Sequence, residues 1–570
     1  MDIRKVNPAV DLFANKYPEA WDYATRIQGM VARKSEHAGG VLILPGPLAE
    51  YIPVERTGGQ KGKLLSAFGE RKGKGNQLIS DYGYVKVDVL RVAELTKQQH
   101  AVDLIYENTG KLVDLDALEI HDDPYAADPL VMQGFADGKL VGIFQFSATA
   151  STLTRKLKPT NILDLALINA GIRPGPRGVG ADQRAARRKN GLEPVTYWHE
   201  MLEPYMDYTY GEMFFQEQLI EVVHHLGGLS LADADMFRKI ASKLYREPQY
   251  AREVMGEYEI PIKASFERNG LDPAASETVW QNLLSFSDYS FNLAHAAGYA
   301  VLAYRDMWLK TYYPREFYAA FLSKGLSQVT KKKIAQKAEA VREARSLGLK
   351  IMPPDINESN GDYTVVDGGI RLGLQAIKGI GPASAQAIID ARPFLNWKDF
   401  TERVPRAKCN RLHRAALVNA GACDRWGMRD DMAEERVDEL ERETLGMSLT
   451  SVYSIQQYAN VIEGKFWTEE QVESVPDGTR VTVMGEVVNI KPWQDSKGNT
   501  MAFIDLNYGS NNWSATIFAR NLAEYEDVIK SRRPIMVSGE KSTYKGRVSI
   551  KVIALPTMEG QVYQPAIIDL

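Results

Sequence analysis

The seven residues from Tyr84 to Leu90, Tyr-Val-Lys-Val-Asp-Val-Leu, alternate apolar with polar side chains. Because successive side chains of a strand point to opposite faces, this pattern predicts a strand with three valines on one face. Lys86 and Asp88 then share the other face. We expect the valine face to form core and the polar face to hold chemistry. A carboxylate beside a lysine suits a divalent cation and a phosphate, although such a pair is more often an exposed salt bridge.

A chain of 570 residues is too long to fold around one hydrophobic core, so we expect about three or four domains. A hydrophobic content of 44% and a charged content of 25% are typical of a soluble globular protein. The sequence has neither an apolar run that could span a bilayer nor a signal core after its first residues, so we expect a cytoplasmic protein without a membrane partner. Cys409 and Cys423 are too few for a disulfide framework or a zinc site, and we expect both to be reduced.

The net charge of −4 conceals a basic segment between residues 150 and 190. That segment has nine Lys or Arg against two acids, an excess of seven positive charges, which would attract a polyanion. Its cluster Arg184, Arg187, Arg188 and Lys189 is also compatible with a solvated helix face. A solvated face is a weaker explanation for Arg173, because the Arg-Pro-Gly-Pro turn fixes its backbone.

Two further segments have the signature of nucleic-acid binding. The first is Ile377-Lys378-Gly379-Ile380-Gly381, which lies between helical patterns and predicts a helix-hairpin-helix whose glycines let backbone N–H groups approach a phosphate. A plain turn between helices is the alternative. The second follows from residue 481, where three strands, a helix and two strands predict an OB-fold barrel. Its aromatic residues, Trp493 and Trp513 among them, would stack bases, although about half of such a set must fill the barrel.

Several short motifs occur in a fixed order along the chain. They are His37 to Val41, the Lys86-x-Asp88 strand, Gly142 to Phe146, Arg173-Pro-Gly-Pro, Thr209 to Gly211 with Gln216 to Gln218, Arg238 to Lys243, Phe291 to Ala297 and Glu443 to Met447. Together they resemble the second palm segment, the fingers and the later connections of the bacterial DNA polymerase III alpha subunit, a C-family replicative polymerase. The resemblance covers essentially the whole chain.

The resemblance implies a multidomain α+β protein with a partial polymerase palm and large α-helical fingers. The expected domains are a thumb remnant (1–35), the second palm segment (36–105), the fingers (106–352), the helix-hairpin-helix region (353–425), a linker (426–471), the OB-fold (472–560) and a tail (561–570). Residues 424 to 443 have nine acids against four bases, so we expect them to face solvent or protein rather than DNA.

The resemblance also assigns roles to residues. Asp88 is the expected metal ligand and acts in catalysis with Lys86. The expected nucleotide-binding residues are Arg173, Arg238, Lys239, Lys243 and His295. DNA binding is expected from Arg184, Arg187, Arg188, Lys189, Lys378, Gly379, Gly381, Trp493 and Trp513. In the family motif Phe-Asn-Lys-Ser-His, this sequence has Leu293 in place of the lysine.

Nucleotidyl transfer needs two Mg²⁺ ions held by several carboxylates, and this chain matches the family pattern at Asp88 alone. The resemblance places the other two palm aspartates before the first residue. We therefore expect a separate chain to carry the first palm segment and the N-terminal phosphoesterase-like domain, while a truncated fragment is also open. Primer-template DNA and deoxynucleoside triphosphates are the expected ligands. The sequence has no clear sliding-clamp peptide, so clamp dependence stays open.

These observations favour a replicative DNA polymerase subunit of a divergent or phage-type enzyme acting in a bacterial cell. One alternative is a degenerate DNA-binding accessory protein without transferase activity. Another is an error-prone alpha-like polymerase.

Overall fold

The structure is a computed structural model. It describes residues 8–27, 30, 37, 39–56, 62–68, 78–79, 81–89, 92–146, 150–243, 248–287, 290–325, 331–447, 449, 466–467, 469–494, 498–508, 511–530, 534–544 and 547–555. The predicted tail and most of the predicted linker lie outside the described residues. The chain divides into two compact units, Met1–Val92 and Ala93–Leu570. The division falls inside the range expected for the second palm segment.

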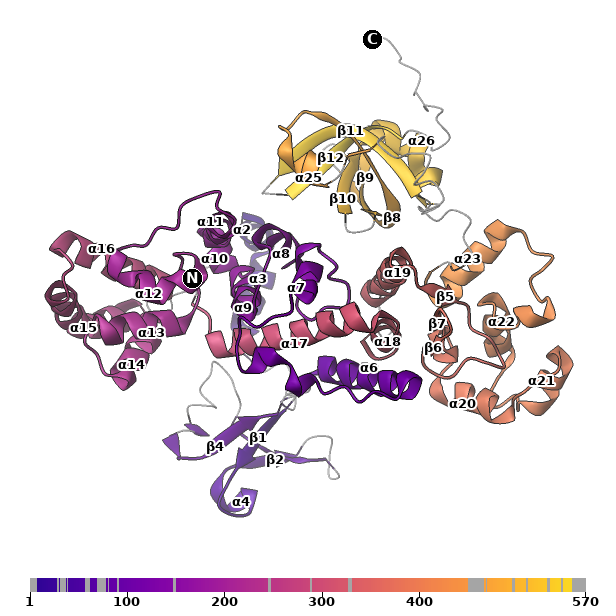
Figure 1. The fold of residues 1–570 in the computed structure, drawn as a ribbon, viewed down its shortest axis with the longest axis horizontal. Coiled ribbons are helices and arrows are strands. Elements are labelled where there is room, and N and C mark those ends of the chain that lie inside the picture. The colour runs from indigo at the N-terminus through magenta and orange to yellow at the C-terminus, as the bar shows by residue number, and fades with distance from the viewer. Residues whose placement is uncertain are drawn as a thin grey trace, which may run out of the picture. The chain divides into compact units, whose positions relative to one another are not determined.

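The first unit contains short helices and two separate antiparallel pairs of strands (Figure 1). Its helices are α2 (Pro8–Lys16), α3 (Pro18–Ile27) and α4 (Leu48–Tyr51). Strand β1 (Gly40–Ile43) pairs with β4 (Val85–Asp88), and β2 (Val54–Arg56) pairs with β3 (Leu64–Ser66). Proline at the first position of α3 suits the start of a helix, because the ring fixes a helical φ and needs no N–H partner.

The alternation predicted for Tyr84–Leu90 is confirmed in β4, but its valine face is not core. Val85 and Val87 lie opposite Ile43 and Val41 across the sheet, and all four side chains are exposed. Lys86, on the opposite face, is 17% exposed. The expectation of a buried valine face was therefore wrong for this sheet, since two strands alone supply no second layer to cover it.

The second unit begins with a large helical region, in agreement with the expected α-helical fingers, and this region has two hydrophobic cores. The first core surrounds the long helix α17 (Leu293–Tyr312), which packs against α6 (Ala93–Thr109), α7 (Pro129–Ala136), α9 (Ile162–Gly171) and α18 (Pro314–Ala320) (Figure 1). The second core is built by α13 (Gln216–His225), α14 (Leu231–Ala241), α15 (Pro248–Arg268) and α16 (Pro273–Ser287). The other helices are α8 (Ser151–Leu157), α10 (Pro174–Gly178), α11 (Ala181–Lys189), α12 (Glu203–Met206) and α19 (Lys331–Ser346).

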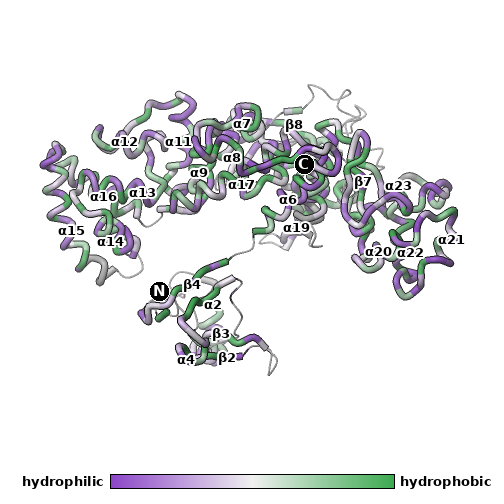
Figure 2. The backbone as a smooth tube through the Cα atoms, turned by 60° about the horizontal axis from the view of Figure 1, so that its bottom comes forward, coloured by the Kyte–Doolittle hydropathy of each residue, from purple (hydrophilic) through white to green (hydrophobic). Residues whose placement is uncertain are grey.

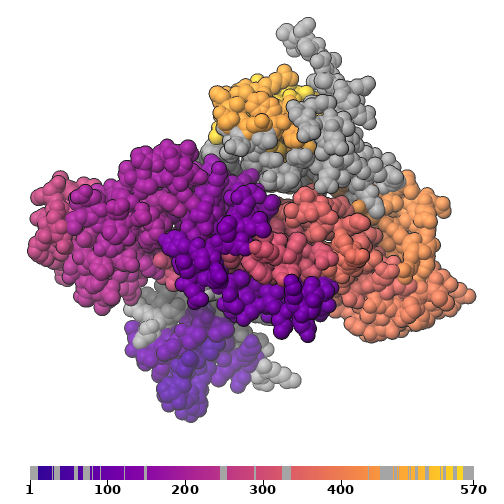
Figure 3. All heavy atoms as spheres, viewed as in Figure 1, coloured from indigo at the N-terminus to yellow at the C-terminus, as the bar shows by residue number. Residues whose placement is uncertain are grey.

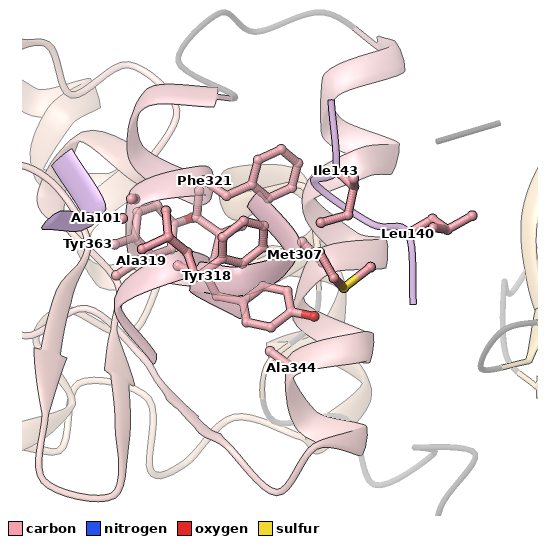
Figure 4. Close-up of a cluster of buried hydrophobic side chains, with 14 of the residues drawn as sticks. Ala101, Leu140, Ile143, Met307, Tyr318, Ala319, Phe321, Ala344 and Tyr363 are labelled. Atoms are coloured by element: carbon pink, nitrogen blue, oxygen red, sulfur yellow. The ribbon is translucent and has the colours of Figure 1, made fainter. Parts of the chain in front are cut away.

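Aromatic side chains fill the first core where α17 meets α18. In Figure 4, Tyr318 and Phe321 lie among Ile143 of the loop before α8 and Met307 of α17. The rings of Phe317 and Phe321 are stacked, with centroids 6.3 Å apart. This packing brings residues that are about 170 positions apart in sequence into one core.

Two buried lysines tie the loop at residues 139–144 to this core. The ammonium of Lys97 donates to the carbonyl oxygen of Gly142 (2.6 Å), and it pairs with Glu94 and with Asp306 of α17 (3.0 Å). The Lys310 ammonium donates to the carbonyls of residues 139 and 141 and to Glu343 (2.7 Å). Each ammonium therefore has a partner for each of its three N–H groups. Burial lowers the pKa of Lys310, while Glu343 opposes that shift.

The residues from 350 to 445 form a compact lobe (orange in Figure 3). It contains α20 (Pro382–Ala391), α21 (Trp397–Arg403), α22 (Arg411–Asn419) and α23 (Glu434–Leu445), and a sheet of β5 (Lys350–Met352), β7 (Gly369–Arg371) and β6 (Thr364–Val366) in that order. Cys409 and Cys423 are buried here as free thiols, and burial raises the pKa of both. Both cysteines thus fit the expectation of reduced side chains.

A closed five-stranded barrel occupies the end of the described chain and confirms the predicted OB-fold. Its strands are β8 (Arg480–Gln494), β9 (Thr500–Tyr508), β10 (Asn511–Ile517), β11 (Pro534–Tyr544) and β12 (Arg547–Ala554), in the spatial order β10-β12-β11-β8-β9. Helices α25 (Glu469–Ser474) and α26 (Ala519–Lys530) accompany the barrel. The barrel has a hydrophobic core of its own.

Hydrophobic segments are short throughout and alternate with hydrophilic ones (Figure 2). Within the described part of the chain, no helix has the length and apolar character needed to cross a membrane.

The Lys97–Asp306 pair predicts a specific stability result. Replacing Asp306 with Ala leaves a buried ammonium short of a partner, and the expected cost is about 3–5 kcal/mol. The double variant Lys97→Met with Asp306→Leu removes both charges and should be less destabilised than Asp306→Ala. Urea unfolding measures both effects, and hydrogen exchange of residues 139–146 locates them. The exposed pair Arg436–Glu439 is the control, and Arg436→Ala should cost at most about 1 kcal/mol. Equal effects at the two pairs would contradict the prediction.

Candidate nucleotide and nucleic-acid interface

In the first unit, Asp88 lies at the end of β4 beside two other polar side chains. Its Oδ1 atom is 3.3 Å from Lys86 Nζ and 3.9 Å from His37 Nδ1. The Asp88 side chain is 47% exposed, so a ligand can reach it. The structure thus brings Lys86 and Asp88 together as the sequence predicts, and it adds His37 to them.

Gly40 makes room for this cluster. It lies opposite Asp88 in the β1–β4 register. A Cβ atom at Gly40 would lie 2.8 Å from His37 Nδ1, 2.9 Å from Lys86 Cε and 3.2 Å from Asp88 Oδ1. The backbone N–H groups of Gly39 and Gly40 donate to His37 Nδ1 at 3.2 and 2.6 Å. Since Nδ1 accepts, the proton of the neutral ring is on Nε2.

As a metal site this cluster is incomplete. A carboxylate oxygen such as that of Asp88 is a suitable Mg²⁺ ligand. The described residues nevertheless contain no group of three or more His, Cys, Asp or Glu that could hold a metal ion. Asp88 therefore supplies one metal ligand, and the described residues around it do not complete the coordination of an ion.

In the second unit, Arg173 is exposed and stacks on an aromatic ring. Its guanidinium carbon is 3.7 Å from the ring centroid of Phe291, a cation–π contact. Arg173 immediately precedes α10, where proline begins the helix and fixes the backbone of the arginine. No carboxylate pairs with Arg173 among the described residues. Its guanidinium therefore has its face supported and its N–H groups available.

A row of rings continues from Phe291 along the first turns of α17. His295 lies 5.5 Å from Phe291 and 4.3 Å from Tyr299, and Tyr299 lies 5.0 Å from Phe144 (all centroid distances). These ring contacts are edge-on or tilted rather than parallel. We call Arg173, Phe291, His295, Tyr299 and Phe144 the stacked row because each side chain contacts the next. It brings together two of the predicted nucleotide-binding residues, Arg173 and His295.

The start of α17 is held by residues whose positioning role the sequence did not reveal. Glu217 accepts hydrogen bonds from the Asn292 side chain and from the backbone N–H of Leu293, both at 2.8 Å. The buried Gln218 accepts from the N–H groups of Phe214 and Phe215 at 2.8 and 2.9 Å. The motif Gln216 to Gln218 was noted as a block. The contact with Asn292, 75 positions away, explains its glutamate, and the bonds to Phe214 and Phe215 explain Gln218.

Arg238, Lys239 and Lys243 belong to a different part of the helical region, in or just after α14. Arg238 and Lys239 both pair with Asp235 of the same helix, at 2.8 and 2.7 Å. Hydrogen bonds from Lys239 and Arg238 lower the pKa of the Asp235 carboxyl. Lys239 is 55% exposed, whereas Arg238 is 17% exposed. The predicted nucleotide-binding residues therefore fall into two groups, one on α14 and one in the stacked row.

The basic cluster on α11 is largely neutralised by its neighbours. Arg184 and Arg188 share Glu212 at 2.7 and 3.0 Å, and Lys189 pairs with the buried Asp164 at 3.0 Å. Arg188 and Lys189 are each 11% exposed. Of the four cluster members, Arg187 has the most exposed side chain, 45%, and it pairs with Glu193. The excess of charge counted along the sequence is therefore not an equal excess on the surface.

The predicted hairpin at Ile377–Gly381 precedes α20. Lys378 and Gly379 are exposed, and Gly379 has a φ of 93°, which favours glycine. A Cβ at Gly379 or Gly381 would meet nothing within 4 Å. The backbone at both glycines therefore faces open space, as an approach to phosphate requires.

On the barrel, the two predicted tryptophans have different environments. Trp493 on β8 is 60% exposed and shares its face with Lys491 and the exposed Phe503 of β9. Trp513 is 5% exposed and packs in the barrel core. The assignment of Trp513 to base stacking is corrected: alternation on β10 turns this side chain inward.

Helical fingers with an exposed cation, a glycine hairpin and an OB-fold barrel together define a modular nucleic-acid-binding protein. Family models agree along the chain: bacterial DNA polymerase III alpha NTPase domain at residues 5–91, bacterial DNA polymerase III alpha subunit finger domain at 94–258, helix-hairpin-helix motif at 348–432 and OB-fold nucleic acid binding domain at 481–555. The chain belongs to the family of bacterial-type DNA polymerase III alpha subunits.

Curated relatives support the same membership. The chain is 28% identical to the DNA polymerase III subunit alpha of Aquifex aeolicus, over 90% of this chain and 45% of the relative. It is 28% identical to that of Escherichia coli, over 94% of this chain and 50% of the relative. With that of Treponema pallidum the identity is 30%, over 72% of this chain and 34% of the relative. The chain spans about half the length of the curated relatives it matches.

The barrel gives a prediction with an internal control. Trp493→Ala should weaken binding of single-stranded DNA by about 1–3 kcal/mol, the typical contribution of one stacked base, and leave the barrel folded. Trp513→Ala should instead destabilise the barrel by about 3–5 kcal/mol because it leaves a cavity. Fluorescence anisotropy with labelled oligonucleotides measures the first effect, and thermal unfolding measures the second. Wild-type DNA affinity in the Trp493→Ala variant would show that this face of the barrel does not bind DNA.

Proposed function

We propose that this chain is a subunit of a replicative DNA-directed DNA polymerase that acts in the bacterial cytoplasm. It would extend a primer on template DNA in the 5′ to 3′ direction, with deoxynucleoside triphosphates as substrates. The observation that most supports this proposal is the exposed Arg173 guanidinium, which stacks on Phe291 next to His295. The membership of the chain in this family supports it as well. A fixed cation offers charge and directed N–H donors to a triphosphate, which is the main task of such a site.

The reacting centre would include Asp88 and Lys86. Asp88 would give one carboxylate ligand to two Mg²⁺ ions, whose chemistry is activation of the primer 3′-hydroxyl and stabilisation of the leaving group. Lys86, 3.3 Å from Asp88 Oδ1, orients that carboxylate and adds positive charge beside it. Gly40 keeps the face open, since a Cβ there would lie only 2.8 to 3.2 Å from atoms of all three polar groups of the cluster.

We further propose that the other two palm aspartates come from a first palm segment, which a separate chain or another part of the same protein carries together with a phosphoesterase-like domain. One carboxylate cannot offset the repulsion of two divalent ions held close together. The exposed apolar face of Val41, Ile43, Val85 and Val87 also supports a partner, because a two-stranded sheet is marginal unless another layer covers it.

Primer-template DNA would be held at several surfaces. Lys378, Gly379 and Gly381 suit a sequence-independent contact with phosphates, and Trp493 suits stacking on a single strand. In the α11 cluster, Arg187 is the best placed for DNA because its side chain is the most exposed of the four, although it pairs with Glu193. Arg238, Lys239 and Lys243 would serve the nucleotide or the template. Dependence on a sliding clamp is a matter for direct assay.

The second candidate function is a DNA-binding accessory protein without transferase activity. The observation in its favour is the single carboxylate of the Asp88 cluster in the described part of the chain. Primer extension separates the two functions, and a fidelity assay separates a replicative enzyme from an error-prone one.

The first test of the polymerase concerns Asp88. The 570-residue chain alone should bind DNA and fail to extend a primer, and a chain bearing the first palm segment should restore extension with Mg²⁺. In the restored pair Asp88→Asn should reduce extension by orders of magnitude with DNA affinity nearly unchanged, because Asn keeps the shape and loses the charge. Lys86→Ala should be milder. Asp81→Asn, an exposed carboxylate before β4, is the matched control. Extension by the isolated chain, or a fully active Asp88→Asn pair, would refute the assignment.

The second test concerns the stacked row. Arg173→Ala in the restored pair should raise the KM for nucleotide by tenfold or more, about 1.4 kcal/mol or above. Phe291→Leu keeps the apolar contact and removes the ring, so it should reproduce part of that effect through a misplaced guanidinium. Arg177→Ala, an exposed arginine in α10, is the control and should leave the KM unchanged. A Phe291 variant that behaves as wild type would show that stacking does not position Arg173.

A further inference from the structure

Three aromatic side chains of the first unit form a parallel stack. The rings of Phe68 and Tyr82 have centroids 5.9 Å apart and planes inclined by 13°, and those of Tyr82 and Tyr84 are 6.1 Å apart and inclined by 9°. Tyr51 of α4 meets the Tyr84 ring edge-on, at 6.4 Å. Tyr82 contacts both other rings and is still 60% exposed. We call Phe68, Tyr82 and Tyr84 the aromatic ladder.

The backbone holds the two tyrosines of the ladder in place. The N–H groups of Tyr82 and Tyr84 donate to the carbonyls of Leu78 and Ile79, both at 3.0 Å. Gly83 between them has a φ of 74°, a left-handed conformation that favours glycine. This turn lets two residues that are only two positions apart set their rings parallel. The ladder is therefore built by the protein before any ligand arrives.

The ladder adjoins the proposed reacting centre. Tyr84 immediately precedes β4, and alternation along the extended chain places it on the face of Lys86 and Asp88. The strand rise puts Tyr84 about 13 Å from Asp88 along the chain. The segment 56–75, which includes Phe68, has six Lys or Arg against one acid. This part of the sequence thus combines flat rings with an excess of positive charge.

We propose that the aromatic ladder is a stacking platform for an unpaired nucleobase of a DNA strand that passes the Asp88 cluster. This inference rests on the proposed DNA-binding function of the chain. An exposed aromatic ring stacks on any base, and each stacked base adds to the affinity for a single strand. Bases inside a duplex are covered by their neighbours, so the platform takes unpaired bases.

Charge favours a nucleic acid over a protein as the occupant of the ladder. The excess of positive charge in the segment 56–75 attracts a polyanion, and stacking on a ring requires no particular base. Both features suit a single strand, whose phosphates and bases are accessible together. The unpaired template ahead of the primer and an unpaired primer end share this chemistry, and a label in one strand or the other distinguishes them.

The first experiment is photo-crosslinking with the full 570-residue chain. Primer-template DNA has 5-iododeoxyuridine, which crosslinks to aromatic rings against which it stacks, at an unpaired template position or at an unpaired primer 3′ end. After irradiation and digestion, mass spectrometry should find the crosslink in the peptide that contains Tyr82. A label inside the duplex should give no crosslink in that peptide. The position of the reactive label identifies the strand that occupies the ladder.

The second experiment measures DNA affinity by anisotropy. Tyr82→Leu should weaken binding of a primer-template with a single-stranded overhang by about fivefold to a hundredfold, the loss expected for one stacked base. Binding of a blunt duplex should change less than twofold. Tyr82→Phe keeps the ring and should bind as wild type does. Tyr106→Leu, at a tyrosine of α6 that is 54% exposed, is the matched control and should leave both affinities unchanged.

Four results would overturn the proposal. The first is an overhang label that crosslinks only to peptides without Tyr82, a result that needs no variant to fold. The second is wild-type affinity of Tyr82→Leu for the overhang. The third is equal weakening of overhang and blunt duplex, which would indicate a general loss of structure. The fourth is weaker binding of a first palm segment with unchanged DNA affinity, which would make the ladder a protein contact. None of these results depends on primer extension, so they leave the test of Asp88 intact.

Discussion

The Lys97–Asp306 pair is the interaction on which the proposed nucleotide surface depends. Asp306, fully buried on α17, accepts from Lys97, from Gln98 at 2.8 Å and from the backbone N–H of Phe144 at 3.0 Å. A buried charge is costly without hydrogen-bond partners. The loop at residues 139–144 must therefore stay where its carbonyl and N–H groups bond to Lys97 and Asp306. The Phe144 ring, and with it one end of the stacked row, is thereby fixed against α17.

The other end of the stacked row is fixed from α13. The carboxylate of Glu217, a residue of α13, accepts from the first backbone N–H of α17, where free N–H groups favour a negative charge. The backbone of Phe291 meanwhile bonds to Phe214 and Gln216 at 3.0 and 2.8 Å. The two hydrophobic cores of the helical region are linked at this point, so a shift between them would move Arg173 relative to its supporting ring. The position of the Arg173 guanidinium therefore depends on the packing of the whole helical region.

The surface charge of this chain depends more on which charged side chains pair with one another than on how many occur in a segment. On α11, acids distant in sequence come close to the arginines and the lysine, and Glu212 serves two of them. In the turn between α21 and α22, by contrast, the exposed side chains of Arg406, Lys408 and Arg411 have no ion pair in the described residues. A count along the sequence therefore singled out the neutralised segment and passed over the available one.

The sequence by itself determined the OB-fold, the helical region, the hairpin and the shared face of Lys86 and Asp88, because period, glycine placement and alternation are local properties. The family followed from the order of the motifs. Only the tertiary structure decided which side of each element is buried. It turned Trp513 inward and Trp493 outward, left the valines of β4 uncovered, and paired Arg188 and Lys189 with acids. Burial and pairing depend on contacts between distant residues, and a local pattern does not contain them.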